Sequence, residues 1–201
     1  MQSAGKIPTE VDDLGLDLAS LSAHKFYGPN GVGALYVRDG VDLEPLIHGG
    51  GQEHGLRSGT ENVAAIVGMG RAAELAVEDR EERRERLTDL RTAFVTAVQE
   101  TTDGVLVGHP EYRLPGYAML CFPGQKGPSL IDALAERDIA VSGGSACHAT
   151  DLSPSRVLVE MGVDPELAIG AVRFSMGRET THQDVEYVSE TLETVLRDCS
   201  D

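Results

Sequence analysis

The sequence predicts an α/β fold, and three observations support that prediction. Residues 1–60 alternate short apolar runs with glycine-rich turns, which is typical of strands and loops. Residues 61–100 are rich in helix-forming side chains. Residues 101–201 alternate strand-like and helix-like segments, the pattern of a small α+β unit. The chain has 201 residues, of which 41% are hydrophobic, so it holds enough apolar material for a core.

Two short strands are predicted near the N-terminus, at residues 14–22 and 33–37. The sequence HKFYGPNG at 24–31 lies between them and is a strong turn signal, so we expect a hairpin with this turn at its end. Residues 48–60, HGGGQEHGLRSGT, predict a loop. A loop of this length and glycine content usually binds something.

One apolar stripe is expected along the helical stretch, because four side chains recur at helical spacing: Leu87, Leu90, Phe94 and Val98. The charged run EDREERRER at 78–86 predicts a solvated face. Gly68 and Gly70 are the expected positions of a bend or break.

Further elements are predicted in the C-terminal half. Ser129 is the expected N-cap of one helix and Pro154 lies in the expected first turn of another. The expected strands are 117–122, 139–142 and 172–176, and the expected helices are 129–138, 154–161 and 181–197.

Charge and composition exclude several classes of protein. The formal net charge is −16, from 17 basic and 33 acidic residues, which argues against a nucleic-acid partner. No apolar run approaches the ~20 residues that span a bilayer, and no secretory signal precedes the first strand. Three cysteines are too few for a disulfide scaffold. These features together predict a reducing, cytoplasmic location.

Lys25 and Cys147 are candidate reactive residues. Lys25 ends an apolar strand in a Gly/Pro turn, where a partly desolvated amine forms a Schiff base with an aldehyde cofactor; a solvated loop lysine is the alternative. Cys147 lies in a loop of small residues, GGSACHAT, that gives a thiolate access to solvent; a passive loop cysteine is the alternative. Cys121 alternates within an apolar strand and is expected to be buried and inert, while Cys199 lies in the last residues.

Arg173 interrupts an apolar strand, AVRFSMG, so we expect it to pair with a carboxylate of the protein or of a substrate. In the loop at 48–60, the glycines with Arg57, Ser58 and Thr60 suggest an anion cradle, more so if a helix starts at Thr60. Two histidines of that loop complete no recognised metal spacing, so no metal is predicted.

Four stretches together resemble the NifS/IscS-type cysteine desulfurases, which are class V aminotransferase-like enzymes that depend on pyridoxal 5'-phosphate (PLP). They are LASLSAHKFYGPNGVGALYVR, HGGGQEHGLRSGTENVAAIVGMG, GGSACHATDLSPSRVLVEMG and VRFSMGRETTHQDV. The resemblance runs from Gln2 to about Val195. The combination of the turn around Lys25 (Ser22 to Gly31, the lysine turn) with the Gly-Ser-Ala-Cys loop is highly specific. It implies the C-terminal part of a fold-type I PLP-dependent transferase. Residues 1–61 would be the C-terminal remnant of the large PLP-binding domain. Residues 62–100 would be a helical segment that links it to residues 101–201, a small α+β domain with the cysteine loop.

The resemblance also implies residue roles. Lys25 would form the Schiff base with PLP and move protons, Ser22 and His24 would bind the cofactor phosphate, and Gln2 would bond the ring hydroxyl. Thr60 would reach the phosphate of the partner subunit's cofactor, which implies a homodimer.

The implied reaction is conversion of L-cysteine to L-alanine. Arg173 would clamp the substrate carboxylate and Cys147 would take the sulfur as a persulfide. A sulfur acceptor or iron–sulfur scaffold protein would receive it for iron–sulfur clusters or thiocofactors.

The chain departs from the family in its length. Family members have a further N-terminal half, which carries the aspartate that pairs with the cofactor's ring nitrogen, so we expect an N-terminally truncated chain. Two alternatives stay open. One is a related selenocysteine lyase or other class V aminotransferase-like enzyme, and the other is an inactive fragment that acts at most as an interaction module.

Overall fold

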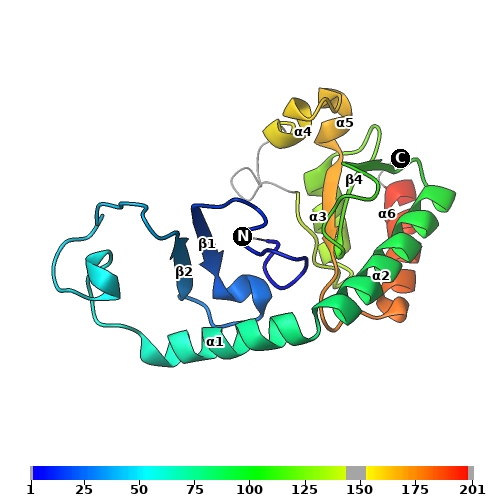
Figure 1. Ribbon diagram of the computed structural model, residues 1–201. Coiled ribbons are helices and arrows are strands. Elements are labelled where there is room, and N and C mark those ends of the chain that lie inside the picture. The colour runs from blue at the N-terminus through cyan, green and yellow to red at the C-terminus, as the bar shows by residue number, and fades with distance from the viewer. Residues whose placement is uncertain (1, 144–152, 199–201) are drawn as a thin grey trace. The chain divides into compact units, whose positions relative to one another are not determined.

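The computed structural model describes residues 2–143 and 153–198, and the chain divides into two compact units, Met1–Glu82 and Arg83–Asp201 (Figure 1). The division falls in the first turn of a helix, inside the stretch that the sequence predicts to be a linking segment. The predicted division into residues 1–61, 62–100 and 101–201 stays a prediction. Each unit has its own sheet and its own buried cluster.

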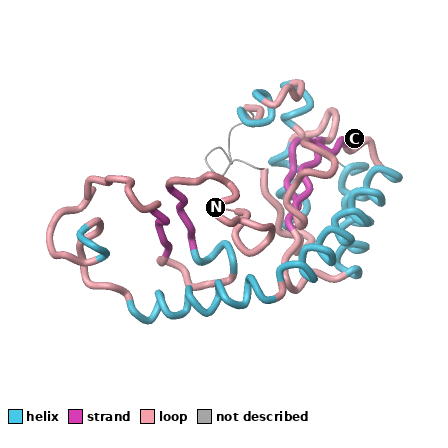
Figure 2. Tube along the Cα trace, viewed as in Figure 1, coloured by secondary structure: helices cyan, strands magenta, loops and turns pink. Residues whose placement is uncertain are grey.

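The first unit contains the predicted hairpin. Strand β1 (Leu18–Ser22) pairs antiparallel with β2 (Gly33–Val37), and Ser22 lies opposite Gly33 (Figure 2). A Cβ at Gly33 would collide with the carbonyl oxygen of Leu21, so only glycine allows the strands this approach. The 3₁₀ helix η1 (Ala23–Phe26) follows β1 directly and carries the lysine turn. The hairpin prediction is confirmed, although β1 begins later than expected.

The helical stretch forms α1 (Val63–Glu78) and α2 (Arg80–Thr101). The break lies at Asp79, so the prediction of a break at the glycines was wrong. Gly68 lies inside α1 and contacts Pro29, because a Cβ at this position would lie 2.8 Å from Cγ of Pro29. This contact requires a glycine there. A Cβ at Gly70 would have no neighbouring atom within 4 Å, so no contact requires glycine there.

The second unit is a three-stranded antiparallel sheet of order β3-β4-β5 with helices around it. The strands are β3 (Val105–Val107), β4 (Tyr117–Cys121) and β5 (Ala171–Ser175). The helices besides α2 are α3 (Gly127–Ala135), α4 (Arg156–Glu160), α5 (Pro165–Ile169) and α6 (His182–Asp198). The strands expected at 117–122 and 172–176 and the closing helix are confirmed.

Several details of this unit differ from the prediction. Helix α3 begins at Gly127 behind Lys126, so Ser129 is not its N-cap. Helix α4 starts at Arg156 with Ser155 as N-cap, which leaves Pro154 outside it. The expected strand at 139–142 is reduced to one bridge, between Ser142 and Arg173. Neither β3 nor α5 was predicted, because such short elements carry no clear periodicity.

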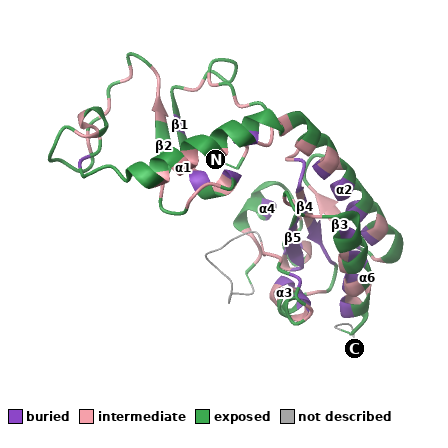
Figure 3. Ribbon diagram, turned by 90° about the horizontal axis from the view of Figure 1, so that it is seen from below, coloured by how far each residue is buried: buried purple, intermediate pink, exposed green. Residues whose placement is uncertain are grey.

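The core of the second unit contains the predicted stripe of α2, whose members Leu87, Leu90, Phe94 and Val98 are all buried (Figure 3). The ring of Phe94 lies 4.7 Å from that of Phe174 on β5 and joins the helix to the sheet. The charged run is mostly exposed, but Arg80, Arg83 and Arg86 are half-buried. Arg86 donates to the carbonyl oxygens of Thr180, Gly177 and Arg178 at 2.7, 3.2 and 2.8 Å, and fixes the turn after β5.

The core of the first unit is small by comparison. Its buried cluster consists of Ala4, Ala23, Phe26 and Ala76. Helix α1 has an apolar sequence, yet Ala76 is the one buried residue among its described positions, and Figure 3 shows most of the helix as exposed. Val63 and Val67 are each 66% exposed. An apolar helix in water is unfavourable, so this surface is suited to a partner.

Candidate functional site

The turn that carries Lys25 has a tightly fixed backbone. The N–H of Gly28 donates to the carbonyl oxygen of Ala23 at 2.9 Å, and Tyr27 adopts a left-handed conformation with φ 66°. A Cβ at Gly28 would lie 2.9 Å from Cβ of Ala23, so glycine is needed to close the turn. Ala23 is fully buried, whereas Lys25 is half-buried and His24 exposed.

Lys6 ties this turn to the start of the chain. Its ammonium donates to the carbonyl oxygen of Gln2 and to that of Lys25, both at 3.0 Å. The residues that the resemblance assigns to the cofactor ring and to the Schiff base are therefore joined by one side chain. Sequence reasoning did not single out Lys6. The local signal is the glycine beside it, Gly5, whose φ of 70° closes a turn.

Three polar side chains at the lysine turn have no protein partner among the described residues. Ser22 is the N-cap residue of η1, but its side chain makes no capping hydrogen bond. Within residues 2–143 and 153–198, the side chains of Ser22, His24 and Lys25 make no hydrogen bond or ion pair. A hydroxyl, an imidazole and an amine on one short turn are the donor set that suits a phosphorylated aldehyde.

The glycine-rich loop is held by its own hydrogen bonds. Ser58 is buried and its hydroxyl donates to the carbonyl oxygen of Gly50 at 3.0 Å. The side-chain oxygen of Gln52 accepts from the N–H of Gly59 at 3.3 Å, and the guanidinium of Arg57 donates to the carbonyl oxygen of Ser58. These groups stabilise the loop, so its predicted role as a ready anion cradle does not extend to the Ser58 hydroxyl.

Thr60 is exposed at the end of that loop. The helix does not start there, because α1 begins at Val63 with Asn62 as N-cap, whose side chain accepts from the N–H of Ala65 at 3.3 Å. The threonine hydroxyl therefore belongs to a loop and not to a helix N-terminus.

Arg173 lies half-buried on β5, opposite Met119 of β4. Its Nη2 reaches the hydroxyl of Ser142 at 3.4 Å, and its Nε is buried without a hydrogen-bond partner. No carboxylate pairs with Arg173 in the part of the chain that the structure describes. A buried, unsatisfied guanidinium N–H is costly, so the group is suited to an incoming anion.

Of the cysteines, Cys147 and Cys199 lie outside the described residues. Cys121 lies on β4 with no exposed surface, and burial raises the pKa of its thiol. The expectation that Cys121 is buried is therefore confirmed. A thiol with a raised pKa is a poorer nucleophile, because less of it is thiolate.

The described residues offer neither a membrane span nor a metal centre. None of the helices there is long and apolar enough to cross a membrane. No group of three or more His, Cys, Asp and Glu side chains is arranged there to hold a metal ion.

The family model of the class V aminotransferases matches residues 1–188. The chain belongs to this family. The predicted resemblance to NifS/IscS-type proteins is confirmed by similarity to curated proteins named cysteine desulfurase IscS. The one from Dictyoglomus turgidum is 47% identical over 197 residues, covering 98% of this chain and 50% of the relative. The one from Methanosarcina thermophila is 42% identical and covers 98% of this chain and 49% of the relative.

Solved structures agree. A NifS-like protein matches with a TM-score of 0.89 and 41% identity, covering 98% of this chain and 51% of that one. A NifS-like protein from Rickettsia africae matches with a TM-score of 0.88 and 32% identity, covering 98% of this chain and 52% of that one. The predicted fold class is thus confirmed. The chain spans about half the length of the curated relatives and structures that it matches.

Proposed function

We propose that this chain carries the lysine turn and the cysteine loop of a PLP-dependent cysteine desulfurase. The observation that supports this most is the donor set at the lysine turn, where Ser22, His24 and Lys25 have no protein partner within the described residues. A turn whose backbone is fixed and whose polar side chains make no hydrogen bond to the described protein leaves those side chains available to a ligand.

The residues present fit the cofactor chemically. Ser22 and His24 would bind the phosphate, and Lys25 would bind the aldehyde carbon. Gln2 would bond the ring hydroxyl, and its carbonyl oxygen shares the Lys6 ammonium with that of Lys25. When bound, PLP supplies an electron sink that stabilises negative charge on the substrate.

The residues of the chain would then perform one sulfur transfer. Arg173 would bind the carboxylate of L-cysteine through its guanidinium group, whose Nε has no hydrogen-bond partner within the described residues. The thiolate of Cys147 would attack the substrate sulfur, and the carbon–sulfur bond would break with its electron pair left on carbon. A proton from Lys25 would complete L-alanine, and the sulfur would remain on Cys147 as a persulfide.

We also propose a homodimer in which Thr60 reaches the cofactor phosphate of the second subunit. The exposed loop position of Thr60 and the exposed apolar surface of α1 support this arrangement, because the hydroxyl is accessible to a second subunit and the apolar surface is stabilised by one. The persulfide would pass to a sulfur-acceptor or scaffold protein for iron–sulfur cluster or thiocofactor assembly, in the cytoplasm.

The experiment is a single-turnover assay of the PLP-treated chain with L-cysteine, read by mass spectrometry. We expect L-alanine in the supernatant and a gain of one sulfur atom on the peptide that contains Cys147. Cys147→Ala should abolish both signals, while Cys121→Ala should keep them because that thiol is buried.

The same assay separates the alternatives. Turnover of L-selenocysteine with none of L-cysteine would identify a selenocysteine lyase. PLP bound at Lys25 with neither substrate consumed would contradict the desulfurase proposal and leave an interaction module.

A further inference from the structure

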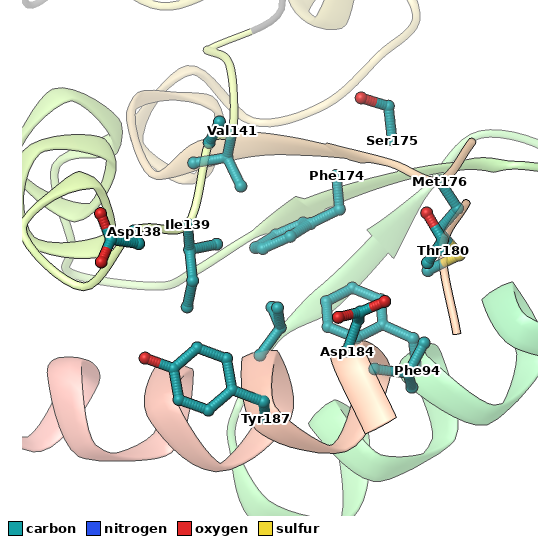
Figure 4. A pocket seen from close by; sticks show the side chains of 13 residues that line it. Phe94, Asp138, Ile139, Val141, Phe174, Ser175, Met176, Thr180, Asp184 and Tyr187 are labelled. Atoms are coloured by element: carbon teal, nitrogen blue, oxygen red, sulfur yellow. The ribbon is translucent and has the colours of Figure 1, made fainter. Parts of the chain in front are cut away.

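The second unit has a pocket of about 330 Å³ that the sulfur chemistry does not use (Figure 4). The pocket lies between residues 138–141, the C-terminal end of β5 and the first turns of α6. Its walls are mainly apolar and come from α2, β5 and the residue after it, α6 and the 138–141 segment: Phe94, Ile139, Phe174, Met176, Val185 and Val188. A cavity of this size and lining accepts one large apolar side chain.

An open sheet edge forms one wall of this pocket. Strand β5 is the last strand of the β3-β4-β5 sheet. On its outer side, Arg173 and Ser142 exchange both backbone hydrogen bonds, at 2.6 and 3.2 Å. Backbone groups alternate in direction along a strand, so the N–H and C=O of Ser175 point to the same outer side as those of Arg173.

Nothing described pairs with that edge at Ser175. The bridge between Ser142 and Arg173 is isolated, and within the described ranges no hydrogen bond joins Ser175 to Ala140, the residue that would continue the ladder. Ser175 is exposed. One backbone donor and one acceptor are therefore open at the pocket wall, in the arrangement that pairs with an added strand.

The charge of the pocket is one-sided. Asp138 and Asp184 line it, and no lysine, arginine or histidine does among the described residues. Figure 4 shows Asp138 beside Ile139 and Asp184 near Phe94. Asp184 already accepts the N–H and hydroxyl of Thr181, both at 2.8 Å, whereas the Asp138 carboxylate accepts no such bond from the described part of the chain. The Tyr187 hydroxyl is also engaged, because it donates to the carbonyl oxygen of Arg137 at 3.1 Å.

We propose that this pocket binds an extended peptide segment of another protein, which adds as a strand along the open edge of β5 at Ser175. One apolar side chain of the segment fills the pocket, and a lysine or arginine beside it faces Asp138. A small amine would satisfy the carboxylate, but it would leave the backbone groups of Ser175 unpaired. An extended peptide satisfies the backbone, the apolar cavity and the charge together.

The probe is a fluorescein-labelled peptide, Lys-Thr-Ile-Thr-Lys, titrated with the full chain and followed by fluorescence anisotropy. We expect saturable binding that weakens about tenfold or more when isoleucine becomes alanine. Replacing both lysines by glutamate should abolish binding. Two further probes carry N-methyl groups on alternate edges of the strand, and one of them should lose binding while the other keeps it, because one edge faces β5.

Two pairs of protein variants test the same contacts. Ser175→Pro removes the outward N–H and should weaken binding about fivefold, while Ser175→Ala keeps it and should bind as the wild type does. Asp138→Asn removes the charge and should weaken binding of the lysine probe; asparagine suits the left-handed backbone there, where φ is 59°. Circular dichroism checks that each variant folds.

Absence of binding by the lysine probe overturns the proposal. So does equal binding of the two N-methylated probes, which reports on the peptides alone and does not depend on any variant folding. Displacement of the probe by phenethylamine at the amine concentration that saturates Asp138 would assign the pocket to a small cation and overturn the peptide proposal as well.

Discussion

The ammonium of Lys6 lies 3.0 Å from the carbonyl oxygen of Lys25 and donates a hydrogen bond to it. The two residues are 19 positions apart, and the same ammonium also bonds the carbonyl oxygen of Gln2. The first few residues of the chain therefore take part in fixing the lysine turn. Because the buried cluster of this unit is small, we expect these hydrogen bonds to contribute a large part of the local stability of the turn.

Lys6→Met should loosen the lysine turn. The variant keeps the length of the side chain but loses both hydrogen bonds, and we expect a loss of about 1–2 kcal/mol in the unfolding free energy of the first unit. The yield of PLP reductively coupled to Lys25 should fall in parallel. Lys126→Met is the matched control, because Lys126 is exposed and makes no capping bond. Equal effects of the two substitutions would contradict the role of Lys6.

Gly68 and Gly70 should respond in opposite directions to alanine. Alanine at Gly70 meets nothing within 4 Å and should stabilise α1 by up to ~1 kcal/mol through helix propensity. Alanine at Gly68 would meet Pro29 at 2.8 Å, so the helix or the turn must move and stability should fall. Urea unfolding of the two variants measures both effects. A stabilised Gly68→Ala variant would refute the contact between α1 and the turn.

Arg86→Met should destabilise the second unit. The substitution leaves the carbonyl oxygens of Thr180, Gly177 and Arg178 without their shared donor. We expect a loss of ~2 kcal/mol by thermal or urea unfolding. Arg84→Met, at an exposed position of the same helix, should change stability by less than ~0.5 kcal/mol. Similar losses in the two variants would mean that Arg86 acts only as part of the charged face.

Asp184 should make the second unit sensitive to acid. Hydrogen bonds from the backbone N–H and the hydroxyl of Thr181 lower the pKa of its carboxyl group. A carboxyl group whose pKa is lower in the folded state contributes stability above its unfolded pKa of ~3.9, and this stability is lost as the pH falls through the folded pKa. Asp184→Asn should therefore reduce stability at pH 6 and flatten its decline below pH 4.

The check is the urea midpoint measured across that pH range. Thr181→Ala should reproduce part of the effect, because it removes the hydroxyl donor but keeps the backbone one. A pH profile in Asp184→Asn that is parallel to the wild type would show that other carboxyl groups determine the acid limit.

Sequence patterns predicted the elements that are determined by neighbouring residues in the chain. The hairpin followed from a Gly/Pro turn between apolar runs, and the stripe containing Leu90 and Phe94 followed from helical spacing. The helix break could not be placed, because Gly68 is set by contact with Pro29, far away in sequence.

The site shows the same limit. Lys25 was singled out from sequence because a Gly/Pro turn after a strand is a local signal, whereas the roles expected of Ser22 and His24 rested on the family resemblance. The Lys6 contact and the internal bond of Ser58 depend on how distant backbone groups meet, and no spacing rule predicts them. The open edge at Ser175 could not be predicted either, because residues 139–142 were expected to form a strand, and the structure leaves one bridge there.

PLP binding at Lys25 would distinguish a functional lysine turn from an ordinary surface turn. The full chain is mixed with PLP, reduced with borohydride, digested and mapped by mass spectrometry. We expect a visible absorption band before reduction and a pyridoxyl group on Lys25, with Lys6 and Lys126 unlabelled. Lys25→Arg should abolish the band. Equal labelling of all these lysines, or no labelling at Lys25, would contradict this expectation.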